Sequence, residues 1–192
     1  MGSNSTRMLE LGTPLPEFSL PDADGKMHSS SDYDSAPGLL VMFVCNHCPY
    51  VQFIAEKLAE VTAEFLEKGL AVVGINSNAA TDPDDAPEKM KDEIKSRGYK
   101  FPYLIDEDQS VAKTYMAQAT PEFFLFDKDR KLVYHGQFDH ARPRRNVPVT
   151  GEHLKEAVDQ VLGGKPVPEK QIPGSGCGIV WETGKEPAYL TG

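Results

Sequence analysis

The sequence predicts an α/β fold with a central mixed sheet flanked by helices. Two continuous apolar runs, residues 39–44 and 70–75, are typical of strands buried on both faces. The segment between them carries apolar residues at helical spacing, so the two strands should be parallel neighbours joined by a right-handed crossover. Two later strand-like runs, joined by residues 128–130, predict an antiparallel hairpin that makes the sheet mixed.

Turn residues place a first hairpin near the N-terminus. Residues 21–25 read Pro-Asp-Ala-Asp-Gly and separate two short strand-like runs, 17–20 and 26–28. The helix after the first buried strand should extend from about residue 50 to residue 68. It should end there because Lys68 and then Gly69 give a cation followed by glycine, a common helix C-terminus.

The second half of the chain alternates short helices and strands. We expect a polar surface helix over 88–97 stopped by Gly98, a strand at 103–105, a short helix at 110–116, hairpin strands at 122–127 and 132–138, and a helix N-capped by Thr150 that runs to 162. The rest is rich in Pro and Gly and has little periodicity. The expected organisation is a lead-in (1–16), one redox domain (17–164) and a C-terminal tail packed on that domain (165–192).

Composition narrows the classes of function. The chain has 192 residues and a formal net charge of -9, which argues against nucleic acid and anionic membranes as partners because both bind basic patches. No apolar run approaches the ~18 residues of a membrane span, and the first residues lack the apolar stretch of a secretory signal. We therefore expect a cytoplasmic protein. Three cysteines in a reducing compartment are typical of catalysis or metal binding rather than of a disulfide framework.

Two of the cysteines stand at a strand-to-helix junction, in Cys45-Asn46-His47-Cys48-Pro49. Unpaired N–H groups and the helix dipole favour negative charge there, so the position lowers thiol pKa values. Pro49 is suited to the first helical position, which would make Cys48 the N-cap. The two sulfurs can approach bonding distance in the first turn. A His47 imidazolium would stabilise a neighbouring thiolate.

With this layout, the chain resembles the thioredoxin superfamily, in its peroxiredoxin-like (AhpC/TSA, redoxin-type) branch. Three features carry the resemblance: the CxxC at the junction, Thr120-Pro121 directly before a strand, and the run Pro14-x-Pro16-x-Phe18-x-Leu20. Together they cover roughly residues 12–163. The resemblance implies a thioredoxin-like fold with an N-terminal hairpin extension and a cis-proline at Pro121 packed against the CxxC. A cis bond would leave the Thr120 backbone free to pair with an extended substrate peptide.

The leading hypothesis is a thiol-disulfide oxidoreductase that cycles a Cys45–Cys48 disulfide, with Thr120, Pro121 and His47 completing the site. Exchange needs one thiolate to attack and a second thiol to resolve the mixed disulfide. The nucleophile stays open: resemblance to thioredoxins favours Cys45, and resemblance to peroxiredoxins favours Cys48. The expected partners are protein or small-molecule thiols and disulfides, together with a cellular thiol reductant.

The first alternative is a peroxiredoxin-like thiol peroxidase that uses Cys48, resolved by Cys45 or Cys177. Cys45 stands where peroxiredoxins have Thr or Ser, and the arginine they carry just before the later strand is absent. Arg142 is a candidate substitute and a candidate anion-binding residue. Disulfide exchange is therefore expected to exceed peroxide reduction.

The second alternative is a non-catalytic thioredoxin-like module that binds a metal or a partner. Cys45, His47, Cys48 and Cys177 would suffice as ligands, but a structural zinc site usually has two separated ligand pairs, and the sequence shows one. We therefore expect neither a metal nor a cofactor. Cys177 has two interpretations: a resolving thiol on a Gly-rich tail, or a small apolar residue that packs the tail down.

Overall fold

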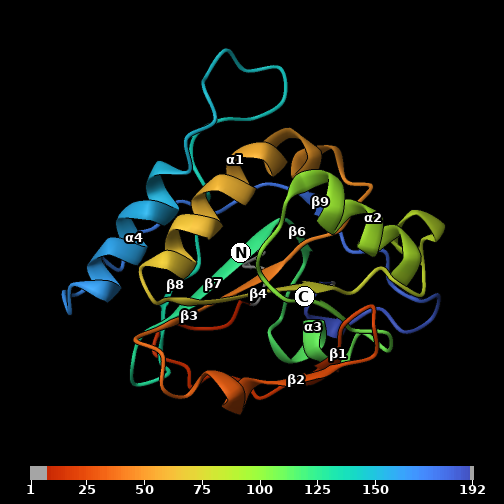
Figure 1. The fold of residues 1–192 in the computed structure, drawn as a ribbon, viewed down its shortest axis with the longest axis horizontal. Coiled ribbons are helices and arrows are strands. Elements are labelled where there is room, and N and C mark those ends of the chain that lie inside the picture. Colours follow the sequence, from red (N-terminus) through yellow and green to blue (C-terminus); the bar gives the residue numbers. More distant parts are fainter. Residues whose placement is uncertain (1–7, 191–192) are drawn as a thin grey trace, which may run out of the picture.

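The protein is described here by a computed structural model that covers residues 8–190, so the first seven residues of the predicted lead-in lie outside the described part. Its core is a five-stranded sheet of order β5-β4-β3-β7-β8 (Figure 1). The central strand β3 (Leu39–Phe43) pairs parallel with β4 (Ala71–Asn76) and antiparallel with β7 (Glu122–Phe126). The outer strands are β5 (Tyr103–Ile105) and β8 (Leu132–Tyr134). The predicted parallel pair and the predicted hairpin are both confirmed.

Helices cover both faces of this sheet (Figure 1). One face carries α1 (Pro49–Glu67), α2 (Pro87–Arg97) and α4 (Glu152–Leu162). The other carries α3 (Ser110–Thr114) and the predicted N-terminal hairpin of β1 (Ser19–Pro21) and β2 (Met27–Ser29). Short 3₁₀ turns complete the fold: η1 (Ser30–Tyr33), η2 (Pro83–Asp85) and η3 (Ala188–Leu190).

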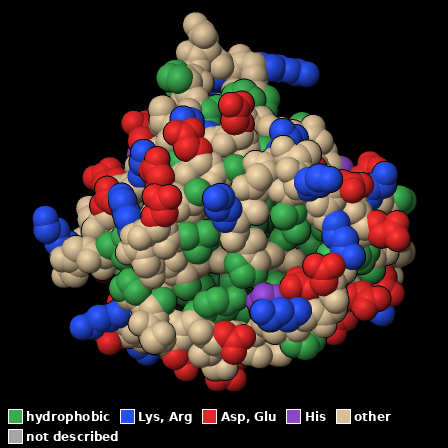
Figure 2. Space-filling model, viewed as in Figure 1, with side chains coloured by type: hydrophobic (Ala, Val, Ile, Leu, Met, Phe, Trp, Pro, Cys, Tyr) green, Lys and Arg blue, Asp and Glu red, His purple; other side chains and the backbone are tan. Residues whose placement is uncertain are grey.

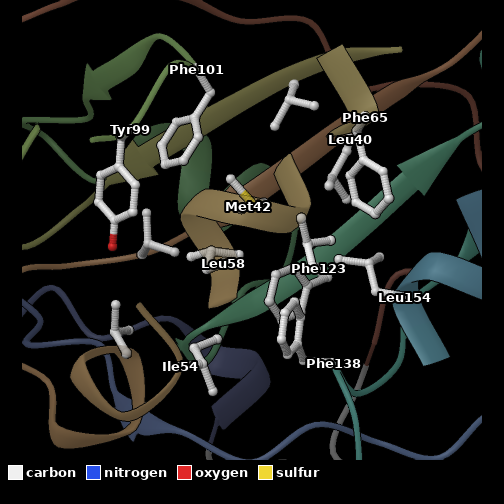
Figure 3. Close-up of a cluster of buried hydrophobic side chains, with 14 of the residues drawn as sticks. Leu40, Met42, Ile54, Leu58, Phe65, Tyr99, Phe101, Phe123, Phe138 and Leu154 are labelled. Atoms are coloured by element: carbon white, nitrogen blue, oxygen red, sulfur yellow. The ribbon is translucent and has the colours of Figure 1, made fainter. Parts of the chain in front are cut away.

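Alternation along β3 divides the core into two clusters, because successive side chains of a strand point to opposite faces. Leu40 and Met42 pack toward α1, whereas Leu39, Val41 and Phe43 pack toward α3. Figure 3 shows the first cluster, in which Leu58 of α1 and Leu154 of α4 meet the aromatic rings above the sheet. Burial of each such side chain contributes roughly 1.5–3 kcal/mol.

The start of α4 differs from the prediction by one residue. Its N-cap is Gly151, not Thr150, and Gly151 has a left-handed φ of 71°. The Asp139 carboxylate accepts hydrogen bonds from the backbone N–H groups of both residues, each 2.8 Å long, and so holds the chain in a tight turn. A Cβ on residue 151 would lie 2.6 Å from the Phe138 ring. Tertiary packing therefore selects glycine at this position.

Charged side chains of both signs are interspersed over the face seen in Figure 2, with hydrophobic side chains exposed between them. Among residues 8–190, no helix combines the length and the apolar character that a membrane span requires.

Gly74 in β4 offers a test of the core. A Cβ there would lie 2.7 Å from the Phe101 ring and 3.3 Å from Val44. Gly74→Ala should therefore overpack this region and lower the free energy of unfolding by about 1–3 kcal/mol in urea titrations. The double variant Gly74→Ala/Phe101→Leu should lose less than the sum of the two single variants, since the smaller side chain makes room. Strict additivity would contradict the proposed clash.

Candidate redox site

The CxxC lies where the prediction put it, between the end of β3 and the start of α1. Pro49 is the first residue of α1 and Cys48 is its N-cap, as expected. Both cysteines are buried: Cys45 is 2% exposed and Cys48 is fully enclosed. The unpaired N–H groups of the first turn of α1 lie beside Cys48, an environment that favours a thiolate over a thiol.

Thr120 contacts this motif from the segment directly before β7. The Thr120–Pro121 peptide bond is cis, as the resemblance implied. The Thr120 hydroxyl lies 3.1 Å from the Cys45 sulfur, and the Thr120 carbonyl oxygen lies 3.3 Å from the Cys48 sulfur. The proline loop and the CxxC, 72 to 75 residues apart in sequence, therefore form one site.

The disulfide corrects the predicted pairing. Cys48 is bonded to Cys177, and Cys45 is a free thiol. The reason is topological. The tail returns to the domain as β9 (Cys177–Gly178), which pairs antiparallel with β6 (Ala119–Thr120) and places Cys177 opposite Thr120. The two Cα atoms of the disulfide are 6.1 Å apart, within the usual range.

Glycine at position 176 permits this docking. A Cβ there would lie 2.2 Å from the Thr120 carbonyl oxygen and 3.1 Å from the Pro121 nitrogen, so the tail backbone runs directly over the cis-proline bond. Two further bonds fasten the segment: the Ile179 N–H donates to the Gln118 carbonyl at 3.0 Å, and the Val180 N–H donates to the Asn78 side chain at 2.9 Å. Cys177 is partly buried, whereas Cys48 is fully buried, so Cys177 is the more exposed residue of the disulfide.

Cys45 is a weak nucleophile in this setting. Burial raises the pKa of its thiol to about 11; the Thr120 hydroxyl acts against this shift, and the negative charge of Asp85 adds to it. Cys45 is therefore protonated at neutral pH and lies out of solvent. These features oppose the role of exposed attacking thiolate that resemblance to thioredoxins favoured for Cys45.

Asp85 is the site residue that sequence reasoning missed. It is completely buried in η2, where its Oδ1 accepts hydrogen bonds from the Asn46 N–H at 2.6 Å and the Asn76 amide at 3.0 Å. Its Oδ2 contacts His47 Nδ1. His47, which stands between the two cysteines of the CxxC, therefore contacts a buried carboxylate. A signal did exist, because residues that follow adjacent parallel strands meet at one edge of the sheet, and the acidic run 82–85 follows β4.

Arg142 lies near the site, in the loop before α4. Its guanidinium donates hydrogen bonds to the Asp139 and Ala141 carbonyls and to the Gln137 side chain. It lines a pocket of about 20 Å³ together with Pro121 and Gly174, no larger than a water site. These bonds hold Arg142 on its own loop.

Comparisons with known proteins place the chain among redox proteins. The thiol-disulfide oxidoreductase ResA of Bacillus thuringiensis subsp. konkukian is 26% identical over 80% of this chain and 78% of its own length. Peroxiredoxin Bcp of Escherichia coli is 26% identical over 77% of this chain and 97% of its own length.

Two solved structures are also similar. A hypothetical protein of Sinorhizobium meliloti 1021 is 49% identical, with a TM-score of 0.90 over 93% of this chain and 98% of that one. The thioredoxin domain of a thiol-disulfide oxidoreductase from Bacteroides vulgatus is 19% identical, with a TM-score of 0.59 over 78% of this chain and 99% of that one. The fold is therefore thioredoxin-like, as predicted. Since the AhpC/TSA family model matches residues 11–135, more than half of the sequence, the chain belongs to the AhpC/TSA family.

Proposed function

We propose that this protein is a thiol-disulfide oxidoreductase whose redox-active pair is Cys48 and Cys177. The observation that carries the proposal is the disulfide between the N-cap of α1 and a tail strand docked beside the cis-proline. The thiol-disulfide oxidoreductase among the relatives supports the same class of activity. Thiols and disulfides are accordingly its substrates and redox partners.

The order of steps in the exchange cycle follows from which cysteine is more exposed and which one leaves more readily as a thiolate. An incoming thiolate attacks the sulfur of Cys177, the more exposed residue of the pair, and forms a mixed disulfide, while the Cys48–Cys177 bond breaks. Cys48 leaves as a thiolate, which the first turn of α1 stabilises; the thiol with the lower pKa leaves faster. A second thiol of the partner then resolves the mixed disulfide. The partner loses two electrons and becomes a disulfide, and Cys48 and Cys177 end as thiols.

The position of the tail strand β9 indicates which kind of substrate the protein could bind. β9 pairs with the Thr120 backbone, the edge at which an extended peptide would add as a strand. The oxidised tail thus covers the position of a substrate peptide, and reduction would uncover it. A protein or peptide disulfide fits this edge, with a cellular thiol as the alternative reductant or substrate.

A thiol peroxidase is the second candidate. A buried Cys-Pro cysteine at a helix N-terminus, joined to a distant second cysteine, is the product expected when a peroxide oxidises Cys48 and Cys177 resolves it. The relative named peroxiredoxin Bcp favours this reading. Against it, the hydroxyl expected near the peroxide is replaced by the Cys45 thiol, and Arg142 is bonded to its own loop.

Cys45 should react slowly with alkylating reagents. In the oxidised protein it is the sole free thiol, so iodoacetamide incorporation reports on it alone. With a pKa of about 11 instead of the ordinary 9.0, its thiolate fraction at pH 8 is roughly 100-fold lower than that of a solvent-exposed cysteine. We expect the alkylation rate to keep rising beyond pH 10, and urea to restore ordinary reactivity. A plateau below pH 9 would contradict the burial of this thiol.

Gly176→Ala should make the Cys48–Cys177 disulfide easier to reduce, because a methyl group at residue 176 pushes the tail off Thr120. An overpacking cost of about 1–3 kcal/mol corresponds to roughly 20–60 mV in a redox titration against glutathione. Gly178→Ala is the matched control, since a Cβ at residue 178 meets nothing within 4 Å. Equal shifts in the two variants would rule out the proposed close approach.

Disulfide exchange should exceed peroxide reduction. Loss of one transition-state donor costs about 2.7–4 kcal/mol, and this site lacks the expected hydroxyl and arginine. Insulin reduction and hydroperoxide consumption are to be measured side by side, with Cys48→Ser and Cys177→Ser inactive in exchange. Rapid peroxide consumption that requires Cys48, without activity on protein disulfides, would replace the first proposal by the second; Arg142→Gln would then identify the substitute donor.

A further inference from the structure

Cys45, His47 and Asp85 form a compact group of potential metal ligands. The thiol sulfur, a ring nitrogen and a carboxylate oxygen all lie within 4.8 Å of one another. Cys45 and Asp85 are buried, whereas the His47 side chain is 23% exposed, so His47 is the member of the group nearest to solvent. The Asp82 carboxylate, also partly exposed, lies 3.5 Å from His47 Nδ1.

Neighbouring hydrogen bonds hold these donors in place. Asp85 uses Oδ1 for the Asn46 N–H and the Asn76 amide, which directs Oδ2 toward His47. The Tyr103 hydroxyl donates to the Asn46 side chain at 2.9 Å and accepts from the Asn76 amide at 3.2 Å. Such an outer layer orients metal ligands in known metal sites. The Asp85 carboxylate is thus presented by a rigid, buried network.

The three donor atoms favour some metal ions over others. Sulfur and nitrogen ligands disfavour calcium and magnesium, which take oxygen ligands. A thiolate, an imidazole and a carboxylate suit Zn²⁺, which accepts three protein ligands and leaves one position open to water or substrate. The thiolate and the carboxylate together supply two negative charges, which neutralise the ion. Bonds to the metal would replace the contact between His47 Nδ1 and Asp85 Oδ2.

We propose that Cys45, His47 and Asp85 bind one Zn²⁺ ion or a similar divalent transition metal. The site uses the one cysteine that the Cys48–Cys177 disulfide leaves free, so metal binding and the redox cycle employ different sulfurs. The oxidised protein therefore binds the metal. This ligand set also differs from a site built from the two CxxC sulfurs, which the disulfide would abolish.

The experiment is a calorimetric titration of the oxidised full-length protein with Zn²⁺, paired with Co²⁺ absorption spectroscopy. We expect one ion per chain and a near-ultraviolet thiolate-to-cobalt band. Cys45→Ser and Asp85→Asn should each weaken Zn²⁺ binding at least about 100-fold, since each removes a ligand. The control is Asp84→Asn, which changes the adjacent exposed carboxylate and should alter affinity less than twofold.

Asp85 is buried, so its variant could fold poorly. His47→Gln alters a partly exposed side chain and should weaken binding by a similar factor, with circular dichroism as the check on folding. The proposal fails if the folded, oxidised protein takes up no stoichiometric Zn²⁺. It fails equally if the Co²⁺ complex lacks the thiolate band, if Asp84→Asn weakens binding as much as His47→Gln, or if binding requires Cys48 rather than Cys45.

Discussion

Thr120 contacts all three cysteine-bearing parts of the chain, and the geometry of the site depends on these contacts. Its hydroxyl lies against Cys45, its carbonyl oxygen against Cys48, and its backbone pairs with the strand that carries Cys177. One residue, held by the cis bond to Pro121 at the start of a buried strand, thus aligns three sulfurs from distant segments. The side chain of Thr120 contacts Cys45, whereas its backbone contacts Cys48 and pairs with β9. A residue without a hydroxyl at this position would therefore lose the contact with Cys45.

The three cysteines lie in different environments, and these environments favour different chemical roles. Cys48 lies at a helix N-terminus, where a departing thiolate is stabilised, and Cys177 lies on a strand that is partly exposed to solvent. Burial raises the pKa of the Cys45 thiol, the negative charge of Asp85 adds to the shift, and Cys45 therefore stays protonated at neutral pH. Two cysteines three residues apart therefore have opposite chemical tendencies. Proximity in a CxxC is not sufficient to make both sulfurs redox partners.

The site combines features of both kinds of relative. Its Cys-Pro at the helix start and its disulfide to a distant second cysteine fit a peroxidase that resolves through a remote thiol. The strand edge at Thr120, which β9 covers in the oxidised protein, fits exchange with other disulfides. The carboxylate of Asp85 adds a third element, because it places His47 and Cys45 in a polar, buried group beside the redox pair. The same short motif thus contributes residues to the redox pair and to the proposed metal site.

The sequence by itself determined the sheet, its parallel centre and the Cys48 N-cap, because apolar runs, helical spacing and turn residues act over short distances. The cis-proline loop was predicted from the resemblance to the thioredoxin superfamily and not from a local pattern. Only the tertiary structure decided which cysteines pair. That outcome depends on the register of β9 against Thr120, and the tail carries no periodicity that sets a register. The place of Asp85 likewise follows from two strand ends meeting at one sheet edge. The pairing of the cysteines is fixed by packing of the whole chain, and no local pattern encodes it, whereas the strand order does indicate the edge at which Asp85 lies.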